Sequence, residues 1–204
     1  FATMRFHMLL FNFAMGLGIR QVVNFTKEAA KVQQMERAFN TMSGGTTNAT
    51  IAINKLKEAT NGTLSEFDLF QQANSAMVLG VTKNSDEMAE MFDMAQRLGA
   101  ALGKDTASSI ESLITGLGRQ SVKMLDNIGI IVKSNEAYED YANANGLIAS
   151  QLTDVEKRQA FFNAALSSGR EKMNDLNTEV LTADQKFQAL GASFDDAGVA
   201  IGEG

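Results

Sequence analysis

The chain has 204 residues, of which 45% are hydrophobic and 21% are charged, a balance typical of a globular protein and not of a disordered one. Its 18 basic and 24 acidic side chains give a net charge of −6, so specific nucleic-acid binding is not expected. The lack of cysteine, together with the single histidine His7, excludes thiolate nucleophiles, zinc–thiolate sites and paired imidazole ligands.

The chain contains no proline, and its 17 glycines fall mostly between segments with helical apolar spacing. This pattern predicts an all-α fold, an array of short capped helices in a compact domain that follows a long amino-terminal helix. At most one short strand is expected, near Ile128–Val132. The first residue is Phe1 and not Met, which favours a segment of a longer polypeptide or a processed product.

Three regions are expected along the chain. Residues 1–45 form an amino-terminal helix with an apolar part and an amphipathic part, and residues 46–169 form the compact helical domain. Residues 170–204 form a carboxy-terminal helical extension. The boundaries follow the Ser43–Thr46 break and the change in pattern between Gly169 and Asp184.

The run from Phe6 to Ile19 is apolar apart from His7 and Asn12. As a helix it would be about 21 Å long, which is shorter than the roughly 30 Å of bilayer hydrocarbon. A helix buried against copies of itself is therefore favoured, and a membrane contact or a signal peptide remain alternatives. The expected oligomer or membrane contact residues are Phe6, Leu9, Leu10, Phe13 and Leu17.

Helix-start signals recur along the chain. Side chains that can accept hydrogen bonds from free backbone N–H groups stand before the apolar segments, and two of them have the spacing of a capping box, Ser65 with Asp68 and Thr153 with Glu156. The predicted starts are Thr47 or Asn48, Ser65, Asn84, Asp105 or Thr106, Ser134, Thr153 and Thr182.

The most regular apolar stripe lies between Asn84 and Lys104, at residues Met88, Met91, Phe92, Ala95, Leu98 and Leu102. The next helix is expected to bury Ile110, Leu113, Ile114 and Leu117 and to be terminated by Gly116 and Gly118. The last helix is expected to turn Phe187, Leu190 and Phe194 inward.

The stretch IGIIV, Ile128 to Val132, is the part of the chain richest in β-branched residues. It predicts either one short strand or an extended buried connector. Because no partner strand is evident, no substantial sheet is expected.

Candidate chemistry is sparse. The loop Gly116–Ser121 has glycines and an arginine, but it follows a helix, whereas phosphate-binding loops follow a strand. Met88, Met91 and Met94 are typical of core filling, with an adaptable binding surface as the alternative. We expect no catalytic residue, no cofactor and no metal site; a glycan hydrolase that uses Glu156 or Glu136 is the least favoured hypothesis.

Four stretches, in this order, carry a resemblance to a known family. They are LKEATNGTLSEFDLFQQANSAMVLGV (Leu56–Val81), ITGLGRQSVKMLDNIGIIV (Ile114–Val132), EAYEDYANANG (Glu136–Gly146) and LTDVEKRQAFFNAAL (Leu152–Leu166). Together they resemble the tail tape measure proteins of tailed bacteriophages and their prophage relatives, over roughly residues 20 to 175.

The resemblance implies a structural virion protein. Such a protein is made in the bacterial cytoplasm, sets tail length during assembly, occupies the tail-tube lumen or tail tip and is ejected ahead of the DNA. Its implied partners are copies of itself, commonly three or six, tail-tube proteins, distal tail or baseplate hub proteins and, on ejection, the host membrane. A secreted or membrane-active helical effector module is the alternative function.

Overall fold

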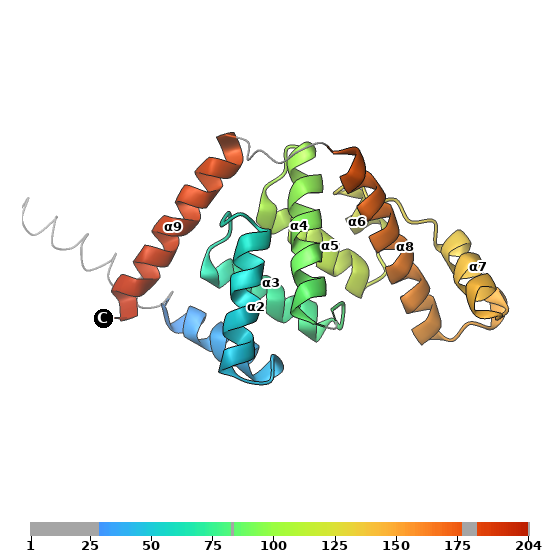
Figure 1. The fold of residues 1–204 in the computed structure, drawn as a ribbon, viewed down its shortest axis with the longest axis horizontal. Coiled ribbons are helices and arrows are strands. Elements are labelled where there is room, and N and C mark those ends of the chain that lie inside the picture. Colours follow the sequence, from blue (N-terminus) through green and yellow to red (C-terminus); the bar gives the residue numbers. More distant parts are fainter. Residues whose placement is uncertain (1–28, 83, 177–182, 204) are drawn as a thin grey trace, which may run out of the picture.

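The computed structural model describes residues 29–82, 84–176 and 183–203, and every regular element in these ranges is a helix (Figure 1). The all-α prediction is confirmed. A helical stretch over residues 29–42 comes first. It is followed by α2 (Thr46–Ala59), α3 (Glu66–Val78), α4 (Ser85–Ala101), α5 (Thr106–Gly118), α6 (Val122–Asp126), α7 (Ser134–Asn145), the 3-10 turn η1 (Ala149–Gln151), α8 (Asp154–Asp175) and α9 (Ala183–Glu203).

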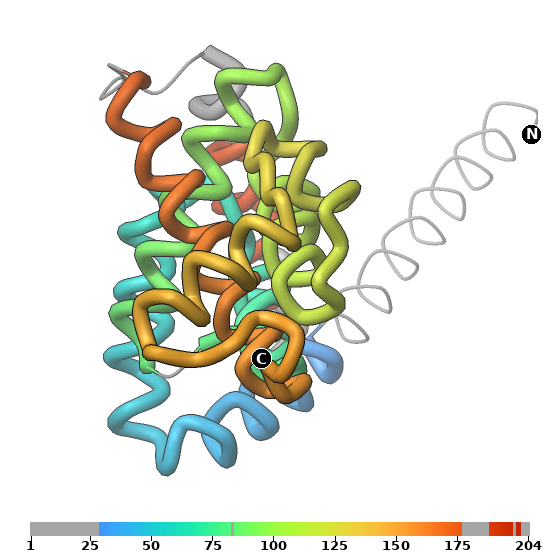
Figure 2. The backbone as a smooth tube through the Cα atoms, turned by 90° about the vertical axis from the view of Figure 1, so that its right-hand side faces the viewer, coloured from blue at the N-terminus to red at the C-terminus, as the bar shows by residue number. Residues whose placement is uncertain are grey.

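Helix α4 lies at the centre of the body and packs against α2, α5 and α8 (Figure 1). α3 and α6 pack against α5, and α7 packs against α8. Figure 2 shows α2 in cyan and the end of α8 in red-orange along one side of the body, with the yellow-green chain around α6 along the other. In α4 and α5, the largest fully buried side chains are Met91, Phe92, Met94, Ile110, Leu113 and Ile114.

Local sequence sets most of the helix starts. The side chains of Ser65, Asn84, Asp105 and Thr153 each accept a hydrogen bond from the backbone N–H three residues later, as predicted. At Thr153 the predicted capping box is complete, because the Glu156 carboxylate also accepts from the Thr153 N–H at 2.7 Å.

The predicted start of α2 at Thr47 or Asn48 was wrong. The helix begins at Thr46, directly after Gly45, and no side chain caps it. Gly44 and Gly45 have φ angles of 79° and 122°, a backbone that favours glycine, so a glycine turn replaces a side-chain cap here.

Residues 128–132 form no strand. Ile128 and Gly129 lie in the turn that follows α6, where Gly129 has a φ of 78°, and residues 130–132 form a connector without regular structure. Ile128, Ile130 and Val132 are buried, and Ile131 is 60% exposed. The Ile130 N–H bonds to the Leu125 carbonyl at 3.1 Å and so continues the turn that ends α6. Of the two predicted alternatives, the strand is wrong. The predicted burial is confirmed at Ile128, Ile130 and Val132, but the connector is not extended at Ile128 and Gly129.

Of the two glycines predicted to end α5, Gly118 is the last residue of the helix, whereas Gly116 lies inside it. They are sites of close helix packing: a Cβ at Gly116 would lie 2.6 Å from Leu125 Cδ2, and one at Gly118 would lie 2.8 Å from Leu79 Cβ. After Gly118 the chain turns at Gln120, which has a φ of 51°. The close contacts at Gly116 and Gly118 are a tertiary reason for a residue without a Cβ at each position.

Three apolar residues expected to face inward are exposed. Leu102 is 53% exposed because α4 ends at Ala101, one residue before it. Leu190 and Phe194 are 52% and 70% exposed because α9 docks through its opposite face. The predicted boundary at residue 169 falls within α8, where Gly169 is buried against Met94 and Ile130.

Two polar side chains of helix α9 accept hydrogen bonds from backbone N–H groups at the starts of α3 and α5. Asp196 Oδ1 accepts from the Glu66 N–H of α3 at 2.7 Å, and its Oδ2 lies 3.3 Å from Lys57 Nζ. Gln188 Oε1 accepts from the Thr106 N–H of α5 at 3.3 Å. Ala192 is buried between these two anchors. The free N–H groups at helix starts therefore fix the position of α9.

A buried hydrogen-bond network links α2, α4 and α5. Gln96 Nε2 donates to the Thr60 carbonyl at 2.6 Å and to Thr63 Oγ1 at 3.1 Å, while Gln96 Oε1 accepts from Asn61 Nδ2 at 2.9 Å. Thr63 Oγ1 in turn donates to Thr106 Oγ1 at 2.9 Å. One α4 side chain thus satisfies the polar groups of the turn that follows α2.

Candidate binding pocket

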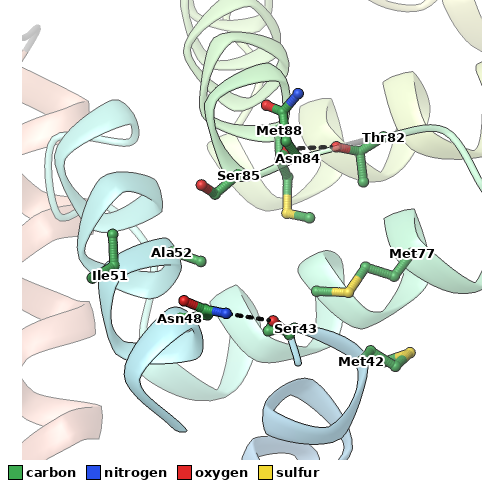
Figure 3. A pocket seen from close by; sticks show the side chains of 10 residues that line it. All are labelled: Met42, Ser43, Asn48, Ile51, Ala52, Met77, Thr82, Asn84, Ser85 and Met88. Atoms are coloured by element: carbon green, nitrogen blue, oxygen red, sulfur yellow. Dashed lines mark hydrogen bonds between the residues drawn. The ribbon is translucent and has the colours of Figure 1, made fainter. Parts of the chain in front are cut away.

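An open pocket lies between the end of the 29–42 helical stretch, α2, the last turn of α3 and the start of α4 (Figure 3). Its volume is about 560 Å³, within the range typical of small-ligand sites. The lining residues are Met42, Ser43, Asn48, Ile51, Ala52, Met77, Thr82, Asn84, Ser85 and Met88.

Helix periodicity and the glycine turn bring these residues together. Asn48, Ile51 and Ala52 occupy one face of α2, because residues three and four apart are neighbours on a helix. The turn at Gly44–Gly45 reverses the chain so that Met42 lies opposite that face (Figure 3). The remaining wall comes from the last turn of α3, the start of α4 and the loop between them.

The pocket is lined by apolar side chains and by polar side chains that form hydrogen bonds with the backbone of other lining residues. Asn48 Nδ2 donates to the Ser43 carbonyl at 3.4 Å, and Thr82 Oγ1 donates to the Asn84 carbonyl at 2.8 Å. The thioethers of Met77 and Met88 point toward the pocket (Figure 3). Because methionine side chains adapt their shape, such a pocket suits an apolar side chain or aliphatic group of varying form.

Sequence reasoning found only part of this pocket. Met88, Met91 and Met94 are all buried, which confirms the favoured prediction of core filling, and only Met88 also lines the pocket. Met42 and Met77 were missed because each lies near the end of a helical stretch, where the apolar period that marks a stripe is short.

The predicted contact residues Phe6, Leu9, Leu10, Phe13 and Leu17 lie outside the described residues, so they stay a prediction. Within residues 29–82, 84–176 and 183–203, no helix combines the length and apolar character needed to cross a bilayer.

Glu156 and Glu136, the residues of the hydrolase hypothesis, both lie at helix starts. The Glu156 carboxylate accepts from the Thr153 N–H and hydroxyl, each at 2.7 Å, and these bonds lower the pKa of Glu156. A general acid of glycoside hydrolysis needs a raised pKa instead. Glu136 pairs with Lys133 Nζ at 3.0 Å. Across the described part of the chain, no group of three or more acidic or histidine side chains is placed to hold a metal ion.

The lowered pKa of Glu156 predicts acid sensitivity at the start of α8. Since the folded-state pKa lies below the ordinary value of 4.5, the stabilisation is complete above that value and is lost as the pH falls through the lower, folded-state pKa. We expect Glu156→Gln, which keeps an accepting oxygen but does not titrate, to reduce the fall in melting temperature between neutral and acidic pH. Differential scanning calorimetry across that range measures the effect.

The matched control is Glu139→Gln, a change of the same charge at an exposed position of α7. It should leave the fall in melting temperature as in the wild type. An equal effect of both substitutions would show that net charge, and not the capping box, determines the acid response.

The pocket is thus a candidate binding site whose lining is part apolar and part polar. In comparisons with known proteins, no family model matches this chain and no solved structure matches it.

Proposed function

We propose that this chain is a compact structural segment of a tail tape measure protein of a tailed bacteriophage or prophage. It acts through its shape and its contacts, in the tail-tube lumen or at the tail tip, and leaves ahead of the DNA. Its partners are other copies of the chain, tail-tube proteins and distal tail or baseplate hub proteins. Catalysis forms no part of the proposal.

The observation that carries the proposal is that the four sequence stretches that resemble tape measure proteins pack against one another. Gly118, in the second stretch, lies against Leu79 in the first. Leu79, Leu117 and Phe162, from the first, second and fourth stretches, line one narrow groove of about 120 Å³. The third stretch lies on α7, which packs against α8, and α8 holds most of the fourth stretch. Stretches that are far apart in the sequence, and that resemble the same family, therefore belong to the same folded body.

The helix lengths support a folded body and not the length-measuring rod. The longest helix described, α8, has 22 residues and spans about 33 Å at 1.5 Å per residue. Shorter helices lie beside α4 and do not continue one another along an axis (Figure 1). The ruler itself would then lie elsewhere in a longer chain. A net charge of −6 also disfavours adhesion to DNA that passes through the same lumen.

Mass spectrometry of purified tails tests the proposal. Trypsin should release residues 124–133, MLDNIGIIVK, since Lys123 and Lys133 bound this peptide. We expect the peptide in intact tails at a constant, low ratio to the tube protein, and we expect it to be lost from particles that have ejected their DNA.

Intact tails that lack the peptide would contradict the proposal. Tails from which the gene has been deleted and which assemble at normal length would contradict the tape measure role in particular. Leakage of liposomes caused by the purified chain, combined with absence from tails, would favour the membrane-active effector instead.

A further inference from the structure

The sequence contains two Asn–Gly pairs, Asn61–Gly62 and Asn145–Gly146. Because glycine has no Cβ, its backbone nitrogen can approach the side-chain amide of the preceding asparagine with little steric hindrance. Such pairs are prone to spontaneous deamidation, a reaction that contributes to the thermal lability of asparagine. Both asparagines are exposed. Since the two pairs carry the same reacting groups, a difference in their reactivity comes from the fold.

Deamidation of Asn61 needs only the chain and water. The backbone nitrogen of Gly62 gives its proton to hydroxide and forms a bond to Cγ of Asn61. The bond between Cγ and Nδ2 breaks, and the amide nitrogen takes a proton from water and leaves as ammonia. The resulting cyclic succinimide is opened by water at either carbonyl, which leaves aspartate or isoaspartate at position 61.

The fold holds both reacting groups of the first pair in other bonds. Asn61 Nδ2 donates to Oε1 of Gln96, a buried side chain of α4, at 2.9 Å. The Gly62 N–H donates to the Lys57 carbonyl of α2 at 3.0 Å. The side-chain amide is thus bonded to one helix and the attacking nitrogen to another. Both bonds must break before the ring can close.

The second pair is restrained only by bonds within its own helix end. Asn145 is the last residue of α7, and its Nδ2 donates to the Tyr141 carbonyl at 2.7 Å. The Gly146 N–H bonds to the Asn143 carbonyl at 3.4 Å, a long distance for such a bond. α7 lies at the edge of the body (Figure 1). The end of an exposed helix opens at a low cost in free energy, so this pair is the less protected of the two.

The product at position 61 would be incompatible with the buried network. A carboxylate there can only accept hydrogen bonds, so Gln96 Oε1 would face a negatively charged oxygen in place of its donor. A half-turn of the Gln96 amide would instead direct Oε1 toward the Thr60 carbonyl, which is also an acceptor. Neither orientation gives every group a partner.

We propose that Asn61 is a deamidation site controlled by the buried Gln96 network. The reaction is blocked while Gln96 holds the Asn61 amide, and it proceeds when the contact between α4 and the turn after α2 opens. The carboxylate then prevents the network from forming again, so the modification makes a transient opening permanent. The proposal is independent of the tail function, because it concerns only the chemistry of the chain in water.

Incubation of the full 204-residue chain at mildly alkaline pH, with and without urea, tests the proposal. Tandem mass spectrometry of the tryptic peptides 58–83 and 134–157 measures the conversion of each asparagine to the acid. In urea, Asn61 and Asn145 should convert at similar rates. In the folded chain, Asn61 should convert about tenfold or more slowly than Asn145, because its reaction requires the opening of a tertiary bond to a buried group.

Gln96→Leu removes the acceptor for the Asn61 amide. In the folded chain it should raise the rate at Asn61 about tenfold and leave the rate at Asn145 unchanged. Gln71→Leu, at an exposed position of α3, is the matched control and should change neither rate. Circular dichroism checks that both variants keep their helices. The comparison of the wild type with and without urea requires no variant.

Asn61→Asp reproduces one product of the reaction and tests its consequence. It should lower the melting temperature more than Asn145→Asp does, although both replace the same amide by the same carboxylate. Equal melting temperatures of these two variants would refute the claim that the product prevents the network from forming again.

Three results would overturn the control of Asn61 by Gln96. The first is conversion of Asn61 in the folded wild type as fast as in urea. The second is a rate at Asn61 that Gln96→Leu leaves unchanged. The third is an equal acceleration at Asn61 and Asn145 in Gln96→Leu, since that result would show that unfolding of the whole chain, and not the Gln96 contact, limits the reaction.

Discussion

Replacing Gln96 with leucine is expected to lower the free energy of unfolding by about 3 kcal/mol. The substitution removes the donor to the Thr60 carbonyl and to Thr63 Oγ1, and it removes the acceptor for Asn61 Nδ2. Gln96 and Thr60 are buried, so water cannot replace these bonds without a cavity. Each buried polar group left without a partner costs about 1–3 kcal/mol.

Urea titration followed by circular dichroism measures the loss. Gln71→Leu is the matched control, because Gln71 is exposed on α3 and its replacement should change stability by less than about 0.5 kcal/mol. Gln96→Glu separates the two halves of the network, since it keeps the oxygen that accepts from Asn61 and loses the donor to Thr60. Stability equal to the wild type in both Gln96 variants would mean that the network contributes nothing to the fold.

Replacing Gly99 with alanine is expected to destabilise the protein by about 1–3 kcal/mol, although alanine is the better helix former. A Cβ at Gly99 would lie 2.6 Å from Ser109 Cβ and would also clash with Ser109 Oγ. The Ser109 Cβ is attached directly to the α5 backbone, so it can move away only if α4 and α5 separate. That separation would disturb the centre of the core, where these two helices pack together.

A double-mutant cycle checks this reason. Ser109→Gly removes both atoms that the new Cβ would strike, so Gly99→Ala should cost less in that background than in the wild type. Gly191→Ala, also within a helix but with no described atom within 4 Å of the added Cβ, is the control and should be neutral or stabilising. If Gly99→Ala raised the melting temperature, as is expected for Gly191→Ala, the result would contradict the close contact between α4 and α5 at Gly99.

The helix starts could be predicted because capping is local. Ser65, Asn84, Asp105 and Thr153 each bond to a backbone group three residues away, so the residues that decide these ends stand together in the sequence. The buried stripe of α4 from Met88 to Leu98 could be predicted equally well, because its apolar residues recur with the period of a single helix. Both predictions depend on interactions inside a single element.

The candidate pocket could not be predicted in the same way. Met42, Ile51, Met77 and Met88 come from four separate parts of the chain, and no spacing in the sequence relates them. Only the packing of α2 beside α4, together with the glycine turn before α2, brings them to one cavity. The contact residues predicted between Phe6 and Leu17 remain untested.

The sequence by itself determined that the chain is all-α, where most of its helices begin and which face of the central helix is buried. The tertiary structure decided what the glycines of α5 do and which way α9 faces. An apolar row on α9 predicted an inward face, yet the helix is docked by Gln188 and Asp196, whose partners Thr106 and Glu66 are 82 and 130 residues away. The reason is physical: unpaired N–H groups at the starts of other helices attract a carboxylate or an amide oxygen, and their positions exist only once the chain has folded.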